Sequence, residues 1–164
     1  FIAADKDIID FLKYNLRSQM FAKALPSLLV KGALKRLDLL RSNPGLKDKL
    51  WENVDALQNG LKSRGFNIGD TNTCVTPVYL EGSVPVAMML VNDLRENYKI
   101  FLSIVIYPVI PKGIILLRMI PTATHTMEDI EQTLAAFEAI REKLENGTYA
   151  KLAEIHTVDV SDER

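Results

Sequence analysis

Arg118 is the residue whose chemistry stands out, because it lies in a strongly apolar stretch. Residues 101–126 consist of an apolar run, a turn rich in proline, and a second apolar run, 114–120, whose one charge is Arg118. A guanidinium keeps its proton, so a buried one needs a fixed anion or several hydrogen-bond acceptors. Its planar fork matches a carboxylate in two parallel hydrogen bonds. Arg118 is therefore either half of a structural ion pair or the group that holds the carboxylate of a small molecule.

Two alternatives stay open for each of three side chains in this region, Arg118, His125 and Tyr107. The ion pair would be with Glu128, Glu131 or another acid. His125 directly precedes an expected helix, where it either donates to a ligand or serves as a cap or structural residue. Tyr107 ends an expected strand and either stacks on a ligand or packs in the core. The two histidines and the single cysteine are too far apart for metal-ligand spacing, so no metal site is expected.

Composition excludes several classes of function. The chain has 164 residues, 48% of them hydrophobic, which suits one domain, or one domain with a fragment of another. Its formal net charge of −1 gives no electrostatic footprint for nucleic acid or an anionic membrane. Cys74 is the only cysteine, which fits a reducing compartment and predicts a cytoplasmic protein. No apolar run reaches the roughly 18 residues of a membrane span.

Periodicity predicts an α+β fold. Apolar residues recur at helical spacing in four long segments, and three shorter segments alternate as strands do. The expected sheet has about three strands with helices packed on one face, preceded by a long helix broken at 43–45. Pro77 favours an edge position for its strand. The long helices are expected at 27–42, 46–64, 84–98 and 126–144, and the strands at 74–80, 100–106 and 114–120.

The first 24 residues predict less regular structure. The apolar start, from Phe1 to Ala4, has no initiator methionine and reads as part of a buried strand, so we expect a fragment of a longer protein. A short helix follows Asp5, and 15–24 are expected to be irregular or extended. Residues 21–25 are faintly similar to the aromatic-Ser-Lys-Ala run around a pyridoxal-binding lysine. The polar lead-in supplies neither the strand nor the phosphate pocket that a Schiff-base role for Lys23 would require.

The order and spacing of several segments resemble one known family. The segments are 1–13, 21–26, 51–53, 61–66 and, most tellingly, Tyr-Pro-x-x-Pro-x-Gly at 107–113 followed by Arg118 and Ala-Thr-His-Thr at 123–126. Together they are similar to the C-terminal part of the α-oxoamine synthases. These include serine palmitoyltransferase, 8-amino-7-oxononanoate synthase, 2-amino-3-ketobutyrate ligase and 5-aminolevulinate synthase. The resemblance covers the chain from Phe1 to about residue 144.

The resemblance implies a function and a cofactor. Such enzymes are homodimers with the class I/II aminotransferase fold (PLP fold type I) that use pyridoxal 5'-phosphate (PLP) to condense an amino acid with an acyl-CoA. The matching arginine, Arg118, would hold the substrate carboxylate. The Schiff-base lysine would lie upstream of Phe1, so the chain alone is expected to hold no catalytic residue, to be inactive and to bind no PLP. Ala22 and Ala24 stand where the family has hydroxyl residues near the cofactor phosphate, which leaves Lys23 as the group that would contact it.

Three hypotheses follow for the whole chain. The leading one is the C-terminal part of an acyltransferase similar to serine palmitoyltransferase or 8-amino-7-oxononanoate synthase. Residues 1–24 would end the large PLP-binding domain, 25–145 would form the small C-terminal domain, and 146–164 would be a tail. The alternative is a free-standing α+β ligand-binding or regulatory module that uses Arg118 to bind a small organic acid. A structural dimerisation domain is the third hypothesis.

Overall fold

The computed structural model of the chain describes residues 2–154. Within these residues the chain divides into two compact units, with the division between Asn43 and Pro44, at the predicted break in the long helix. We call residues 2–43 the N-terminal unit and residues 44–154 the C-terminal unit, and describe each by itself. The domain boundary predicted after residue 24 concerns a longer protein and stays a prediction. None of the helices in the described part of the chain is long and apolar enough to cross a membrane.

The N-terminal unit consists of helices α1 (Lys6–Asn15), α2 (Arg17–Met20) and α3 (Ser27–Ser42). The predicted irregular segment 15–24 contains the single helical turn of α2. None of the three helices buries a side chain within the described structure. The apolar residues of this unit therefore form no core of their own.

The buried strand predicted from Phe1 to Ala4 is not found where it can be checked. Phe1 lies outside the described residues, so its part of the prediction is untested. Ile2, Ala3 and Ala4 are exposed and are not in a strand, so the prediction is wrong for them. A strand needs a neighbour to satisfy its backbone, and no strand of the described chain pairs with these residues.

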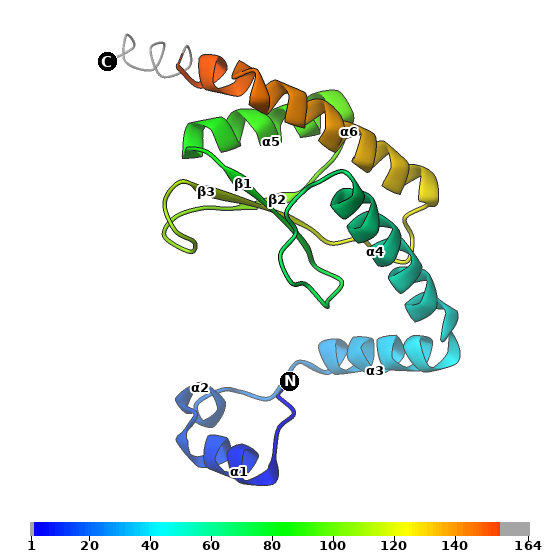
Figure 1. Cartoon of the computed structure of the whole chain (residues 1–164). Helices are drawn as coiled ribbons and strands as arrows, with labels where there is room; N and C mark the ends of the chain where they lie inside the picture. Colours follow the sequence, from blue (N-terminus) through cyan, green and yellow to red (C-terminus); the bar gives the residue numbers. More distant parts are fainter. Residues whose placement is uncertain (1, 155–164) are drawn as a thin grey trace. The chain divides into compact units, whose positions relative to one another are not determined.

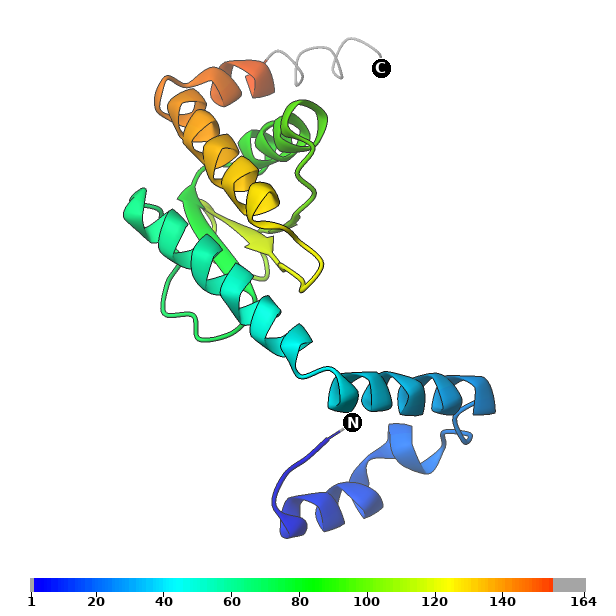
Figure 2. The ribbon, with the colours of Figure 1, turned by 90° about the vertical axis from the view of Figure 1, so that its right-hand side faces the viewer.

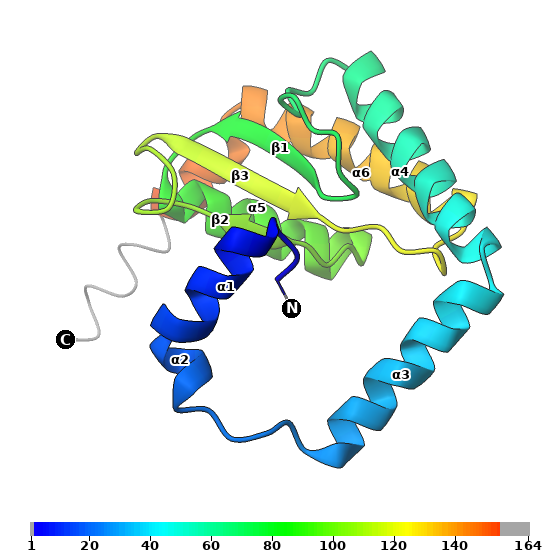
Figure 3. The same cartoon turned by 90° about the horizontal axis from the view of Figure 1, so that it is seen from below.

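The C-terminal unit is built on a three-stranded antiparallel sheet. Strands β1 (Thr76–Glu81), β2 (Ser103–Val105) and β3 (Ile114–Met119) lie in the order β1-β3-β2, so β3 is central (Figure 3). Pro77 lies in an edge strand, as predicted, where its missing N–H costs no ladder hydrogen bond. All three strands were predicted, although β2 is shorter than the expected 100–106.

Helices α4 (Gly45–Ser63), α5 (Val84–Tyr98) and α6 (Met127–Glu145) cover one face of this sheet (Figures 1 and 2). Their apolar stripes and the inward residues of the strands form one core, which includes Leu57, Leu61, Val78, Leu90, Leu94, Ile115, Leu117, Leu134 and Phe137. The predicted α+β fold, with three strands and helices on one face, is confirmed.

Local signals in the sequence set the ends of these helices. Thr126 and Asp129 form a capping box at the start of α6, and Asp129 accepts from the Thr126 N–H at 2.8 Å. These backbone and side-chain hydrogen bonds from Thr126 lower the pKa of Asp129. After α4, Gly65 takes a φ of 77°, and the Phe66 N–H donates to the Leu61 carbonyl at 3.0 Å. The end of α4 and the start of α6 lie within one residue of the predicted bounds, 46–64 and 126–144, because capping chemistry is readable from residue type.

The core continues past α6. Residues 148–154 are helical, and Tyr149 and Ala153 are buried. The Tyr149 hydroxyl donates to Asp93 of α5, which also accepts from Lys143 of α6 at 2.7 Å. Residues 146–154, which the sequence analysis assigned to a tail, are therefore packed against the domain. The acidic residues 159–163 lie outside the described residues.

Candidate functional site: the open face of the sheet

The strands alternate between a face packed on the helices and a face that α4, α5 and α6 leave uncovered. We call the second one the open face; it carries Pro77, Tyr79, Glu81, Ser103, Val105, Ile114, Leu116 and Arg118. Pairing across the sheet places Arg118 directly between Pro77 of β1 and Ser103 of β2. The next row is Tyr79, Leu116 and Val105. The open face is therefore mostly apolar, with the guanidinium of Arg118 on its central strand and the carboxylate of Glu81 at the far end of β1, opposite Ile114.

Arg118 is exposed in the described structure, which corrects the expectation of a buried guanidinium. Strand alternation explains the difference, because the neighbours Leu117 and Met119 point into the core and Arg118 points away from it. Its Nε donates to the Ser103 Oγ at 2.9 Å. Within residues 2–154, no carboxylate lies within the 4.0 Å of an ion pair with Arg118.

The predicted alternative, an ion pair between Arg118 and Glu128 or Glu131, is therefore wrong. Glu131 instead lies 4.0 Å from Arg64, which pairs more closely with Glu138 at 2.7 Å. These contacts join α4 and α6 on the helical side of the sheet. In the described structure, neither terminal nitrogen of Arg118, Nη1 or Nη2, has a charged partner.

Tyr107 lies in the turn between β2 and β3. Its ring is more than half exposed, so the alternative of a core aromatic is wrong. The Lys112 ammonium lies over the ring, 4.9 Å from its centroid. Stacking of Tyr107 on a ligand stays a prediction.

His125 closes the turn that precedes α6. Its Nδ1 accepts from the Thr122 N–H at 2.9 Å, and its backbone carbonyl accepts from Asn53 at 2.8 Å. Asn53 is fully buried and also donates to the Thr122 carbonyl at 2.9 Å. These hydrogen bonds support the structural alternative for His125. Asn53 was missed, since a polar residue in a helical stripe gives no sign of a partner some seventy positions away.

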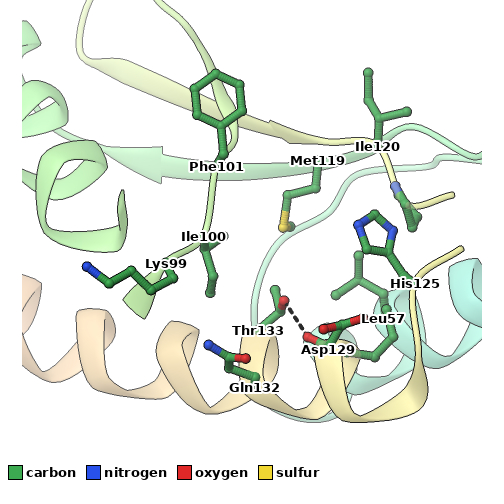
Figure 4. Close-up of a pocket in the computed structure, with 12 residues that line it drawn as sticks. Leu57, Lys99, Ile100, Phe101, Met119, Ile120, His125, Asp129, Gln132 and Thr133 are labelled. Carbon is green, nitrogen blue, oxygen red and sulfur yellow. Dashed lines mark hydrogen bonds between the residues drawn. The ribbon is translucent and has the colours of Figure 1, made fainter. Parts of the chain in front are cut away.

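A pocket with a volume of about 190 Å³ lies on the helical side of the sheet, beside His125 (Figure 4). Leu57 and Met119 supply apolar walls, and Lys99 and His125 are polar groups at its lining. Arg118 does not line it, because consecutive residues of β3 point to opposite faces. The structure therefore does not bring the side chains of His125 and Arg118 into one pocket.

A second hollow, about 300 Å³ in volume, adjoins the open face. It lies under the loop at residues 68–75 and shares Pro77 and Tyr79 with that face. Thr71 and Thr73 line it, and the hydroxyl of Thr71 donates to the Val75 carbonyl at 2.9 Å. The row that holds Arg118 thus has a recess at its β1 end.

Lys23 belongs to the N-terminal unit, in the exposed segment between α2 and α3. Ala22 and Ala24 on either side of it are exposed as well. Nothing in the described structure tests a contact between Lys23 and a cofactor phosphate, so that contact stays a prediction. The Schiff-base lysine expected upstream of Phe1 likewise stays a prediction, because Phe1 itself lies outside the described residues. Among residues 2–154 no cluster of three or more histidine, cysteine or acidic side chains forms a metal site.

Comparison with known proteins decides the family. Residues 1–137 match the family described as aminotransferase class I and II. The chain belongs to this family. A cysteate-C-fatty acyltransferase of Capnocytophaga ochracea is 65% identical over 162 residues, which are 99% of this chain and 39% of that protein. An 8-amino-7-oxononanoate synthase of Exiguobacterium sibiricum is 33% identical over 145 residues, or 88% of this chain and 37% of that protein.

Solved structures place this family member among the same enzymes. A structure of SPT, serine palmitoyltransferase, with a PLP internal aldimine superimposes with a TM-score of 0.70 at 27% identity. The match covers 84% of this chain and 34% of that one. The Sphingomonas wittichii serine palmitoyltransferase has a TM-score of 0.70 at 23% identity, which shows the shared fold.

These matches confirm the predicted membership in the PLP-dependent α-oxoamine synthases. They also confirm that the chain is part of an enzyme family, and one with PLP as its cofactor. The chain spans about two fifths of the length of the curated relatives it matches. What the whole protein acts on is a separate question.

Proposed function

We propose that this chain is the C-terminal part of a PLP-dependent acyltransferase that condenses an amino acid with a fatty acyl thioester, and that Arg118 binds the substrate's carboxylate. One observation carries the assignment of Arg118: its guanidinium is exposed on a mostly apolar face and has no acidic partner in the described structure. A carboxylate satisfies such a group in a bidentate geometry. The matches to acyltransferases favour this proposal over the free-standing organic-acid-binding module.

Cysteate is the amino acid we propose, in place of the serine that an enzyme similar to serine palmitoyltransferase would use. The support is the identity of 65% across nearly the whole chain to a cysteate-C-fatty acyltransferase, against 27% to the SPT structure. Cysteate carries a sulfonate where serine carries a hydroxyl, and both have the α-carboxylate that Arg118 would bind. The acyl-CoA thioester, the homodimer and the cytoplasmic location implied by the family belong to this proposal as well.

Residues 2–154 do not fit a complete cofactor site. A Schiff-base lysine works in a desolvated pocket, and no lysine in the described part of the chain is buried. The lysine that would bind the cofactor would lie upstream of Phe1 in a longer protein, as the family resemblance implies. On this proposal the 164-residue chain has no acyltransferase activity by itself.

The chain's own contribution is to bind and orient the amino acid. Arg118 lies on the central strand of a sheet, so its backbone is fixed by pairing on both sides. The residues directly opposite Arg118, Pro77 on β1 and Ser103 on β2, carry no charge, so neither competes with a carboxylate for the guanidinium. A carboxylate held at one point on a rigid strand restricts how the rest of the amino acid is presented.

The test uses the full-length enzyme with Arg118→Ala and Arg118→Lys. We expect Arg118→Ala to lower kcat/KM for the amino acid by about a hundredfold or more, since the carboxylate loses its charged partner. Arg118→Lys keeps the charge but not the planar fork, so its kcat/KM for the amino acid should lie between those of the wild type and Arg118→Ala. The KM for the acyl thioester should stay unchanged. Arg95→Ala, which removes an exposed arginine from α5, is the matched control.

Substrate choice is measured on the same preparations. Initial rates with cysteate, serine, alanine and glycine, each with a palmitoyl thioester, should rank cysteate first. An Arg118→Ala enzyme with an unchanged kcat/KM for the amino acid would refute the role of Arg118. A wild-type enzyme that prefers serine would refute cysteate while leaving the acyltransferase assignment intact.

A further inference from the structure

The partner of Arg118 on the neighbouring strand is Ser103, a residue that nothing in the sequence singled out. The two residues are directly opposite in the pairing of β2 with β3. The Ser103 Oγ accepts from the Arg118 Nε at 2.9 Å and donates to the Arg118 backbone carbonyl at 3.4 Å. One hydroxyl thus contacts both the side chain and the backbone of the same residue, which orients the hydroxyl as well as the guanidinium.

Arg118 has no comparable partner on its other side. The residue opposite it on β1 is Pro77, whose side chain neither donates nor accepts a hydrogen bond. The guanidinium therefore leans toward β2, and Ser103 determines which of its nitrogens is engaged. Within the described structure the two terminal nitrogens, Nη1 and Nη2, have no hydrogen-bond partner in the C-terminal unit.

A guanidinium offers a carboxylate two edges. The side edge presents Nε and one Nη, and the end edge presents Nη1 and Nη2; each matches the two carboxylate oxygens. With Nε donating to Ser103, the side edge has lost one of its two donors. The end edge keeps both donors, so it is the edge on which a bidentate pair can form without breaking an existing hydrogen bond.

We infer that Ser103 is a positioning residue that holds the Arg118 guanidinium so that a substrate carboxylate is bound through Nη1 and Nη2. The inference rests on the proposed function, because it requires Arg118 to bind a carboxylate. It adds that specificity for the position of the carboxylate comes from β2 as well as from β3. Without the Ser103 hydroxyl, the guanidinium could also present its side edge, and the carboxylate would be held in more than one position.

The test is amino-acid kinetics of the full-length enzyme with Ser103→Ala and Ser103→Thr. We expect Ser103→Ala to raise the amino-acid KM by about tenfold, as loss of one hydrogen bond to a charged group does, with a smaller change in kcat. The KM for the acyl thioester should not change. Ser103→Thr keeps the hydroxyl on a residue that suits strands and should restore the amino-acid KM to within about twofold of wild type.

Two further variants separate positioning from a structural role. Ser63→Ala removes an exposed serine hydroxyl at the end of α4 and should leave both KM values unchanged. Ser103→Ala added to Arg118→Ala should have no further effect on the amino-acid KM, because the group it positions is gone. An additive effect in that double variant, or an unchanged KM in Ser103→Ala alone, would overturn the inference. If Arg118→Ala itself leaves kcat/KM for the amino acid unchanged, the proposed function fails first.

Discussion

The two units of this chain have similar proportions of apolar residues but use them differently. In the C-terminal unit, three helices and a sheet close around a core in which Phe137 and Leu117 are fully buried. In the N-terminal unit, Phe11 is 64% exposed and Leu28 is 79% exposed, and no helix there buries a side chain. The same types of residue are thus in contact with protein in one unit and with water in the other.

This difference shows where folding free energy resides within the chain. Burial of apolar surface stabilises a domain by roughly 25 cal/mol per Å², and only the C-terminal unit gains it within residues 2–154. An isolated helix shorter than about 15 residues is marginal in water, whatever its sequence. Helix α1, with 10 residues, is strongly amphipathic, and the N-terminal unit supplies no core that buries its apolar face.

The largest expected effect comes from separating the two units. Residues 44–164, expressed alone, should unfold in one cooperative thermal transition, because their core is complete. A peptide of residues 1–43 should be mostly unstructured in water at 25 °C. Far-UV circular dichroism of the two pieces measures both. A cooperative, helical melt of the 1–43 peptide would show that its helices do not depend on any other surface.

A pair of matched substitutions tests the same difference at single residues. Phe137→Ala removes a fully buried ring that meets Phe66 edge-on at 5.4 Å, and should cost about 3–5 kcal/mol in the free energy of unfolding. Phe11→Ala removes the same ring from α1 and should cost about 0.5 kcal/mol or less in this chain. Urea titration of the 164-residue chain measures both. Equal losses for the two variants would contradict the comparison.

Much of the C-terminal unit could be predicted from the sequence, because local signals and tertiary packing agree there. The capping box at Thr126, the left-handed Gly65 and Pro77 at an edge each have a local physical cause that residue type reveals. The N-terminal unit was predicted less well. A strand starting at Phe1 requires partner strands. An apolar run predicts that the segment is buried, but it does not identify the element that covers it.

Of the two residues that form the candidate site, Arg118 was predicted from the sequence and Ser103 was not. A charge within an apolar run marks Arg118 without any knowledge of the fold. Ser103 becomes significant only through the register of β2 against β3, which depends on the turn between them. The assumption that Arg118 is buried failed because alternation along β3 was not applied to it. Strand parity, counted from the buried Leu117, would have placed Arg118 on the open face.

The smallest expected effect concerns the anchor of residues 148–154. Asp93 accepts from Lys143, from Asn97 at 2.6 Å and from the Tyr149 hydroxyl. Partial burial acts to raise the pKa of Asp93, but these hydrogen bonds outweigh it and hold the pKa below its ordinary value of 3.8. Burial and the Asp93 carboxylate raise the pKa of Tyr149, so its hydroxyl stays protonated and donates at neutral pH.

Tyr149→Phe should therefore cost about 2 kcal/mol at pH 7, the usual loss for a hydrogen bond to a charged group. Because the pKa of Asp93 is lower in the folded chain, its contribution is complete above the ordinary carboxyl pKa and is lost as the pH falls through the folded value. The difference in the free energy of unfolding between wild type and Tyr149→Phe should therefore become smaller below about pH 4.

Tyr14→Phe is the matched control in the N-terminal unit, where the ring is exposed, and should change the free energy of unfolding by no more than about 0.5 kcal/mol. Urea titrations at pH 7 and pH 3.5 measure both variants, and a loss that does not depend on pH would show that the Tyr149 ring, rather than its bond to Asp93, anchors the segment.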